Sequence, residues 1–198
     1  MKKVSIAAFS TKGASLARRI AAALSAEVFS PAKFAGDGMA AFPSTLEEWT
    51  EKQFAEADAI IFVSACGIAV RSIAPFIKSK TTDPAVVVLD EMGRNVISLL
   101  SGHIGGANEL TKEIAQITGG NAVVTTATDV HGLVAVDEWA QNNNCAIENI
   151  KAAKIVSAAV LEGQKIGVAV TDELRPTPWP ITLWLRPRDL VLGVGCKK

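Results

Sequence analysis

The stretch Ser98-Leu99-Leu100-Ser101-Gly102-His103-Ile104-Gly105-Gly106-Ala107-Asn108 joins an apolar strand end to the start of a helix through a glycine-rich turn. Few packing requirements call for residues in that order. The small residues of the turn, Ser101, Gly102, Gly105 and Gly106, let the backbone approach a ligand closely. His103 carries the side chain best suited to proton transfer near neutral pH. The stretch therefore predicts a strand–turn–helix unit with a ligand site in its turn.

Strand and helix patterns alternate on both sides of this unit. Strands are predicted at 3–9, 27–29, 59–63, 85–89, 96–100 and 122–124, with helices at 16–24, 44–54, 66–77 and 107–118. The alternation predicts a three-layer, open and mostly parallel α/β sheet with helices on both faces. The short connection 90–95 predicts an antiparallel hairpin at one edge. A further unit follows a boundary between 130 and 145. It combines helices at 133–141 and 150–161 with strands at 166–170 and 181–185.

Composition limits the classes of partner. The chain has 198 residues, of which 49% are hydrophobic, and its 20 basic and 20 acidic residues are interleaved, so that the net charge is zero. No basic stripe indicates nucleic acid or an anionic membrane face. No apolar run approaches the ~18 to 20 residues that cross a bilayer, and the first residues are typical of a strand, not of a signal peptide. We therefore expect a cytoplasmic protein with no membrane or nucleic-acid partner.

Cysteine and histidine usage indicates no metal site. Cys66, Cys145 and Cys196 are odd in number, widely separated and without CxxC spacing, which predicts neither a disulfide framework nor a thiolate metal centre. Cys66 begins a helix, where a thiol is activated, but a nucleophile also needs a base nearby. The turn 10–13 lacks a complete phosphate-binding loop, so nucleotide chemistry is disfavoured.

Polar residues follow several predicted strands, where ligands bind in open α/β sheets. We expect the turns after parallel strands to meet at one edge of the sheet. His103 is the predicted general base and Glu91 the carboxylate that assists it, with His131 as a second candidate. Each has a simpler interpretation: His103 holding its turn through a backbone hydrogen bond, Glu91 as a solvated carboxylate, and His131 as a turn residue. Asp129 is either a site carboxylate or a helix cap.

Eight short runs of this sequence closely resemble one family. They are 66–71, 73–75, Lys80, 83–88, 90–91, 99–103, 105–108 and 125–129, and together they span about a third of the chain. They are similar to the amino-terminal domain of the cobalt-precorrin-5A hydrolases, the CbiG family of anaerobic cobalamin biosynthesis.

The resemblance implies a reaction and a substrate. Family members open the δ-lactone of cobalt-precorrin-5A and release the extruded ring carbon within acetaldehyde, which gives cobalt-precorrin-5B. The implied partner is a cobalt-containing corrinoid, with the cobalt carried by the substrate and no cofactor required. The acetate and propionate arms of that macrocycle make Arg71 and Lys80 expected carboxylate binders. The full set of expected substrate-binding residues is Gly67, Arg71, Lys80, Ser101, Gly102, Gly105, Gly106, Asn108, Thr126 and Asp129.

The resemblance also implies a domain organisation. It divides the chain into an amino-terminal α/β domain at 1–135, a small α+β middle domain at 136–190 and the start of a missing carboxy-terminal domain at 191–198. A different class of function stays open, namely a non-catalytic module that binds the corrinoid or tetrapyrrole for the same pathway. A nucleotide-binding domain is the least favoured alternative, and a homodimer is compatible with the sequence.

Overall fold

The computed structural model describes residues 3–36, 38–133, 136, 145–147, 149–164 and 194–196. The chain forms two compact units, Met1–Val124 and Thr125–Lys198. The first unit holds most of the described residues and all of the mixed sheet.

The sheet of the first unit has seven strands in the order β3-β2-β1-β4-β5-β6-β7. Its strands are β1 (Val4–Ala8), β2 (Glu27–Ser30), β3 (Met39–Ala41), β4 (Ala59–Val63), β5 (Ala85–Leu89), β6 (Asn95–Leu100) and β7 (Asn121–Val123). Strands β1 to β5 are parallel, β6 is antiparallel to β5, and β7 is parallel to β6. The predicted mostly parallel sheet with one antiparallel hairpin is confirmed. Strand β7 lies outside β6, so the last two strands both run against the other five.

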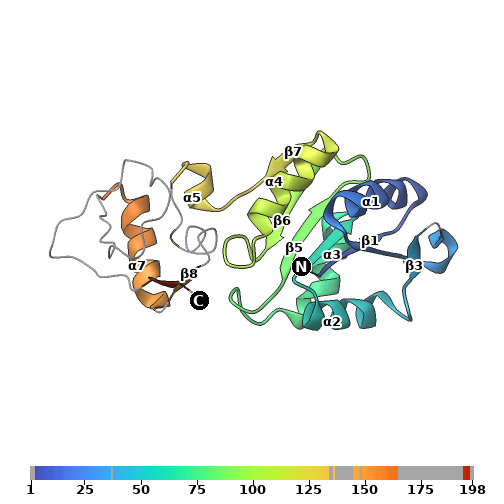
Figure 1. Ribbon diagram of the computed structural model, residues 1–198, viewed down its shortest axis with the longest axis horizontal. Coiled ribbons are helices and arrows are strands. Elements are labelled where there is room, and N and C mark those ends of the chain that lie inside the picture. The colour runs from blue at the N-terminus through green and yellow to red at the C-terminus, as the bar shows by residue number, and fades with distance from the viewer. Residues whose placement is uncertain are drawn as a thin grey trace. The chain divides into compact units, whose positions relative to one another are not determined.

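Helices cover both faces of this sheet, which gives the predicted three layers (Figure 1). Helices α1 (Thr11–Leu24) and α4 (Ala107–Thr118) pack on one face, and α2 (Leu46–Glu56) and α3 (Cys66–Ile73) on the other. Short 3-10 helices are η1 (Ala32–Phe34) and η2 (Ala74–Phe76). Every residue of β4 and β5 is buried, because a parallel strand covered on both faces meets apolar neighbours with successive side chains.

Polar side chains set where the helices begin. The Ser10 hydroxyl accepts a hydrogen bond from the Gly13 amide at the start of α1, and Thr45 accepts one from Glu48 at the start of α2. Both are N-cap contacts that satisfy an otherwise unpaired helix amide. Strand β3 was not predicted from the sequence, because it has only three residues.

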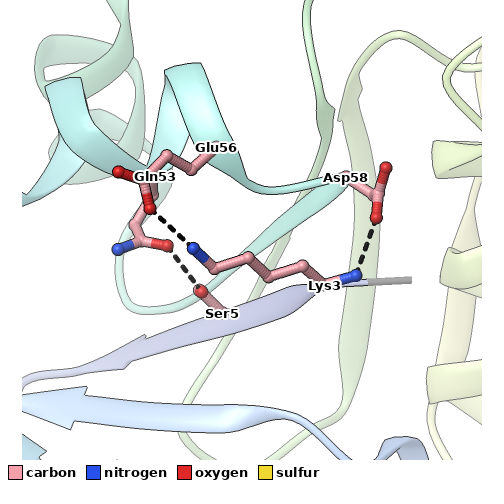
Figure 2. A network of polar contacts seen from close by, with 5 residues as sticks. All are labelled: Lys3, Ser5, Gln53, Glu56 and Asp58. Atoms are coloured by element: carbon pink, nitrogen blue, oxygen red, sulfur yellow. Dashed lines mark hydrogen bonds and ion pairs between the residues drawn. The ribbon is translucent and has the colours of Figure 1, made fainter. Parts of the chain in front are cut away.

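A polar network ties the start of β1 to the end of α2 (Figure 2). The Ser5 hydroxyl donates to Gln53 Oε1 at 2.7 Å in a buried contact between sheet and helix. The Lys3 amide donates to Asp58 Oδ2, and Lys3 Nζ pairs with Glu56 Oε2, both at 2.7 Å. The hydrogen bond between Lys3 and Glu56 raises the pKa of the lysine and lowers the pKa of the glutamate. These contacts fix the edge of the sheet at which β1 and β4 begin.

The described part of the second unit combines helices and a two-stranded sheet. It contains α5 (Ala127–Val130), α7 (Ile150–Leu161), β8 (Cys145–Ile147) and β9 (Val194–Cys196), with β8 and β9 antiparallel. The helix predicted at 150–161 is confirmed. The strands predicted at 166–170 and 181–185, and most of the helix predicted at 133–141, lie outside the described residues.

Candidate functional site

The reversal of β6 gives the sheet two distinct edges. In the β5–β6 pair, Val86 lies opposite Leu100 and Leu89 lies opposite Val96. We call the edge at which β1 to β5 end the carboxyl edge, and the edge at which they begin the amino edge. Strand β6 ends at the amino edge. The turn that follows β6 therefore lies at the opposite end of the sheet from the turns that follow β1, β4 and β5.

The turn Ser101–Gly106, called the α4 loop from here on, folds tightly against the start of α4. The amide of Ala107 donates to the Ser101 carbonyl at 3.1 Å, and the amide of Asn108 donates to the Gly102 carbonyl at 3.0 Å. Within the loop, the Gly106 amide donates to the His103 carbonyl at 3.0 Å. The loop is thus a closed turn held by backbone hydrogen bonds at both of its ends.

Two positions of the α4 loop require particular residues. A Cβ at Gly105 would lie 2.4 Å from Ser101 Cβ and 2.7 Å from the Ser101 carbonyl oxygen, closer than any side chain permits. Gly106 has φ 85, and Ser101 itself has φ 58, a left-handed conformation that is uncommon for a residue with a side chain. The Ser101 Cβ and carbonyl therefore pack directly against Gly105.

Asn108 anchors the first turn of α4 to the sheet. Its side chain is 1% exposed, and its Oδ1 accepts a hydrogen bond from the Ser98 hydroxyl at 2.7 Å. Ser98 was not among the predicted site residues, because a single serine in an apolar strand carries no signal of its own. The anchor holds the α4 loop between two fixed points, β6 and α4.

The Ser101 hydroxyl is buried without a hydrogen-bond partner. Among the described residues, only Trp49 Nε1 and Thr111 Oγ1 share this condition, and both of these belong to helices packed on the sheet. A buried polar group left unpaired costs about 1–3 kcal/mol, so a hydroxyl in that state is a natural place for a ligand atom. Within the described residues, the amides of Gly102, Ile104 and Gly105 also donate no hydrogen bond.

His103 lies half-buried in the middle of the α4 loop. It follows the free amide of Gly102 and precedes that of Ile104, at the positive end of the 12-residue helix α4. An imidazole beside donors of this kind suits proton transfer to or from a group that carries developing negative charge.

Lys80 lies at the amino edge too. It belongs to the connection that enters β5, and β5 is the neighbour of β6. Asp83 organises this connection: its buried carboxylate accepts hydrogen bonds from the amides of Lys78 and Ser79 at 2.9 and 3.0 Å. The predicted residues Lys80, Ser101, Gly102, His103, Gly105, Gly106 and Asn108 therefore share one edge of the sheet.

Glu91 lies at the carboxyl edge, and the predicted pairing of Glu91 with His103 is corrected. Its carboxylate accepts a hydrogen bond of 2.6 Å from the Ser10 hydroxyl in the loop after β1. Strand β5, about 13 Å long at roughly 3.3 Å per residue, runs between the edge that holds Glu91 and the edge that holds His103. The prediction failed because it grouped the turn after an antiparallel strand with the turns after parallel strands.

Asp90, the neighbour of Glu91, shapes the hairpin turn. Its carboxylate accepts hydrogen bonds from the amides of Met92, Arg94 and Asn95 at 2.9, 3.3 and 2.7 Å. Burial favours the neutral acid, but the three backbone hydrogen bonds and the Arg94 charge outweigh burial and lower the pKa of Asp90. The carboxylate is therefore engaged in holding the turn.

Gly67 and Arg71 also belong to the carboxyl edge. The Arg71 guanidinium folds back over the first turn of α3, with Nη1 3.2 Å from the place where a Gly67 Cβ would stand. A shallow groove beside it is lined by Leu46, Glu47, Ile68, Arg71, Ser72 and Pro75. The structure does not bring these residues together with the α4 loop.

Three predicted residues lie in the second unit. Thr126 and Asp129 contact each other there, with the Thr126 hydroxyl donating to Asp129 Oδ2 at 2.7 Å. Thr126 is the N-cap of α5 and His131 its C-cap. Asp129 is thus tied into the first turn of a short helix whose N-cap is Thr126, and it is not itself the cap.

The described residues contain no group of three or more His, Cys, Asp and Glu side chains that could hold a metal ion. None of the described helices has the length and hydropathy needed to span a membrane.

Comparisons with known proteins agree with this architecture. Residues 48–129 match the family model for the cobalamin synthesis G N-terminal region, and residues 134–186 match the model for the cobalamin biosynthesis central region. A cobalt-precorrin-5A hydrolase from Salmonella typhimurium is 41% identical over 236 aligned positions, which cover 100% of this chain and 67% of that protein. One from Priestia megaterium is 45% identical over 120 positions, covering 61% of this chain and 32% of that protein.

A solved structure shares the fold. It is described as a cobalamin biosynthesis protein G homolog from Sulfolobus solfataricus, with a TM-score of 0.57 and 22% identity, and the match covers 98% of this chain and 60% of that one. Fold and site together define a doubly wound α/β protein with a glycine-rich loop at the start of a helix. The chain belongs to the CbiG family of cobalamin-biosynthesis proteins. It spans about two thirds of the Salmonella relative and less of the other proteins named.

Proposed function

We propose that this chain hydrolyses cobalt-precorrin-5A at the α4 loop. The observation that carries the proposal is the position of His103, half-buried between unpaired amides at the positive end of α4. The relatives that carry the name cobalt-precorrin-5A hydrolase support the substrate. The cobalt belongs to that substrate, and the reaction as proposed requires no cofactor from the protein.

In the first step, His103 takes a proton from water while the water oxygen attacks the lactone carbonyl. The negative charge that forms on the carbonyl oxygen is stabilised by the amides of Gly102 and Gly105. The ring C–O bond then breaks, and the alkoxide receives the proton that His103 holds. The products of this step are a carboxylate on the macrocycle and a free hydroxyl group.

In the second step, the hydroxyl gives up its proton and becomes the carbonyl of acetaldehyde. The C–C bond to the macrocycle breaks, and its electron pair stays in the macrocycle, which then takes up a proton. His103 serves again as the base for the hydroxyl proton. Glu91 has no part in either step, because it lies at the carboxyl edge.

The test is acetaldehyde release from cobalt-precorrin-5A by the purified chain, with His103→Ala as the variant. We expect His103→Ala to slow the release by roughly 10²–10⁴-fold, the usual contribution of a general base. Ser64→Ala is the control, since Ser64 is at the carboxyl edge and its hydroxyl contacts only the next carbonyl. Release at the normal rate from His103→Ala, with the wild type active, would refute the role of His103.

A corrinoid-binding module without hydrolytic activity is the second candidate, favoured by one observation: Glu91, the carboxylate predicted to assist His103, lies at the opposite edge of the sheet. A shift of the corrinoid absorption spectrum on adding the chain, with no acetaldehyde formed, would favour this candidate. We also expect a cytoplasmic location, no nucleic-acid partner and a homodimer. The site roles of His131, Thr126, Asp129, Gly67 and Arg71 also stay predictions.

A further inference from the structure

The side chain of Asn108 occupies the space that a side chain at position 102 would need. A Cβ on Gly102 would lie 2.8 Å from Asn108 Oδ1 and 3.2 Å from both Cγ and Nδ2, so the whole carboxamide lies against this glycine. Gly102 is not among the glycines with a positive φ, so its φ is one that other residues adopt. Glycine is therefore required at position 102 by the carboxamide of Asn108 and not by a left-handed backbone.

Asn108 is itself fixed from both sides. Its side chain is 1% exposed, and the Ser98 hydroxyl of β6 donates to its Oδ1 at 2.7 Å. Its own amide donates to the Gly102 carbonyl at 3.0 Å. Asn108 thus connects β6 to Gly102 through its side chain, and α4 to Gly102 through its backbone. Removing the carboxamide would leave only the second of these connections.

The position of Gly102 determines that of His103, which follows it directly in the chain. On its other side, His103 is held by the hydrogen bond from the Gly106 amide to its carbonyl at 3.0 Å. A side chain as buried as that of Asn108 offers substrate no surface to contact, so its effect on a reaction passes through its neighbours. Such an effect can be large, because a displacement of about 1 Å in an active site can cost about 10²-fold in rate.

We propose that Asn108 is a positioning residue for His103. With Ser98 behind it, the carboxamide holds Gly102 in place and so sets where the His103 imidazole and the Gly102 amide stand. The inference rests on the proposed function for the reaction in which His103 takes part. It gives Asn108 no contact with the substrate, and it makes Gly102 and Asn108 a pair matched in size.

The first experiment measures kcat and KM for acetaldehyde release from cobalt-precorrin-5A by the full chain. We expect Asn108→Ala to lower kcat by about 10–100-fold and to keep KM within about twofold, because a positioning residue affects the chemical step more than binding. Ser98→Ala removes only the hydroxyl behind the carboxamide. It should show the same pattern at a smaller size, and it keeps the test valid if Asn108→Ala folds poorly.

Ile114→Val is the matched control for both variants. It removes one methyl group from a fully buried side chain further along α4, so it lowers stability without touching Gly102. We expect it to leave kcat and KM unchanged.

A double variant tests the size match between the two residues. Gly102→Ala alone puts a methyl group 2.8 Å from Asn108 Oδ1, and we expect it to lower kcat by about 10–100-fold. In the Asn108→Ala background the new methyl group no longer meets the carboxamide. The same substitution should then lower kcat by less than about threefold further, because the two changes act on one contact and are not additive.

A measurement without substrate separates this inference from the proposed function. The chain has two histidines, so His131→Gln identifies the ring signal of His103 in NMR spectra of the histidine-labelled chain. We expect Asn108→Ala to shift or broaden the His103 ring signal and the Gly102 amide signal. Ile114→Val should leave both signals in place.

Three kinetic results would overturn the inference. They are a normal kcat in Asn108→Ala, a raised KM with a normal kcat in that variant, and a loss from Gly102→Ala that is as large in the Asn108→Ala background as in the wild type. A chain that releases no acetaldehyde would refute the proposed hydrolysis. The inference would then be decided by the His103 ring signal, and a signal identical in the wild type and Asn108→Ala would overturn it.

Discussion

Replacing Gly105 by alanine tests whether the α4 loop is as tightly packed as described. The new Cβ would lie 2.4 Å from Ser101 Cβ and 2.7 Å from the Ser101 carbonyl oxygen, whereas carbon atoms in contact lie about 3.5–4.0 Å apart. A shift of roughly 1 Å is therefore needed, and both obstructing atoms belong to one residue with φ 58, fixed by its hydrogen bond from Ala107. Overpacking of this kind costs about 1–3 kcal/mol, which we expect Gly105→Ala to lose in stability.

Gly67→Ala is the matched control for this prediction. A Cβ at Gly67 meets only the end of the flexible Arg71 side chain, and the position is inside a helix. Alanine in a helix is more stable than glycine by about 0.5–1 kcal/mol, so Gly67→Ala should be neutral or stabilising.

The assay is urea unfolding followed through the amide signals of β4 and β5, which report on the first unit alone. We expect the midpoint to fall for Gly105→Ala and to hold or rise for Gly67→Ala. Equal midpoints for Gly105→Ala and the wild type would refute the close approach of Gly105 to Ser101.

Three further predictions concern groups whose partners are known. Ser98→Ala removes the hydrogen bond to the buried Asn108 Oδ1 and should cost about 0.5–1.5 kcal/mol in urea unfolding, with line broadening of the α4 loop amides in NMR spectra; unchanged stability and spectra would contradict the anchor. Ser5→Ala removes the hydroxyl that donates to the buried Gln53 Oε1 and should lower the stability of the fold. The double variant Ser5→Ala/Gln53→Leu should recover part of that stability, and a double variant less stable than the sum of its single variants would contradict the pairing. The lowered pKa of Asp90 means that its ionised form stabilises the fold at pH values above the ordinary 3.8 and that this contribution disappears as pH falls through the lower, folded-state pKa; Asp90→Asn should therefore flatten the acid side of the stability profile, and a profile identical to that of the wild type would contradict it.

The elements that the sequence predicted best are those with one strong local cause. Strands 59–63 and 85–89 agree with the structure residue for residue because they are apolar on both faces, which only a covered parallel sheet requires. Helix 107–118 was also predicted to the residue, since its first residue follows the loop glycines and Gly119 ends it with φ 73. Strand β3 was not predictable, because a three-residue edge strand has too few residues to show alternation.

The grouping of the candidate site residues was predicted only in part. The residues of the α4 loop, Lys80 and Asn108 do share an edge, but Glu91 belongs to the other one. The information for the correction was present in the sequence, because a five-residue turn between 89 and 95 forces β6 to run backwards and to end where β5 begins. Ser98 and the burial of Ser101 were beyond reach, since both depend on how β6 and α4 pack in three dimensions.

The hairpin and its neighbours also determine how the sheet can assemble. Strands β5, β6 and β7 pair with one another within residues 85–123, whereas the pairing of β1 with β4, in which Val4 meets Ala59, closes across α1, β2, β3 and α2. Closing a short loop loses less chain entropy than closing a long one, so the pairs within residues 85–123 meet a smaller entropic barrier to assembly than the β1–β4 pair. The α4 loop lies inside this segment. The hydrogen bonds that shape it, from Ser98 to Asn108, therefore lie within a stretch of fewer than forty consecutive residues.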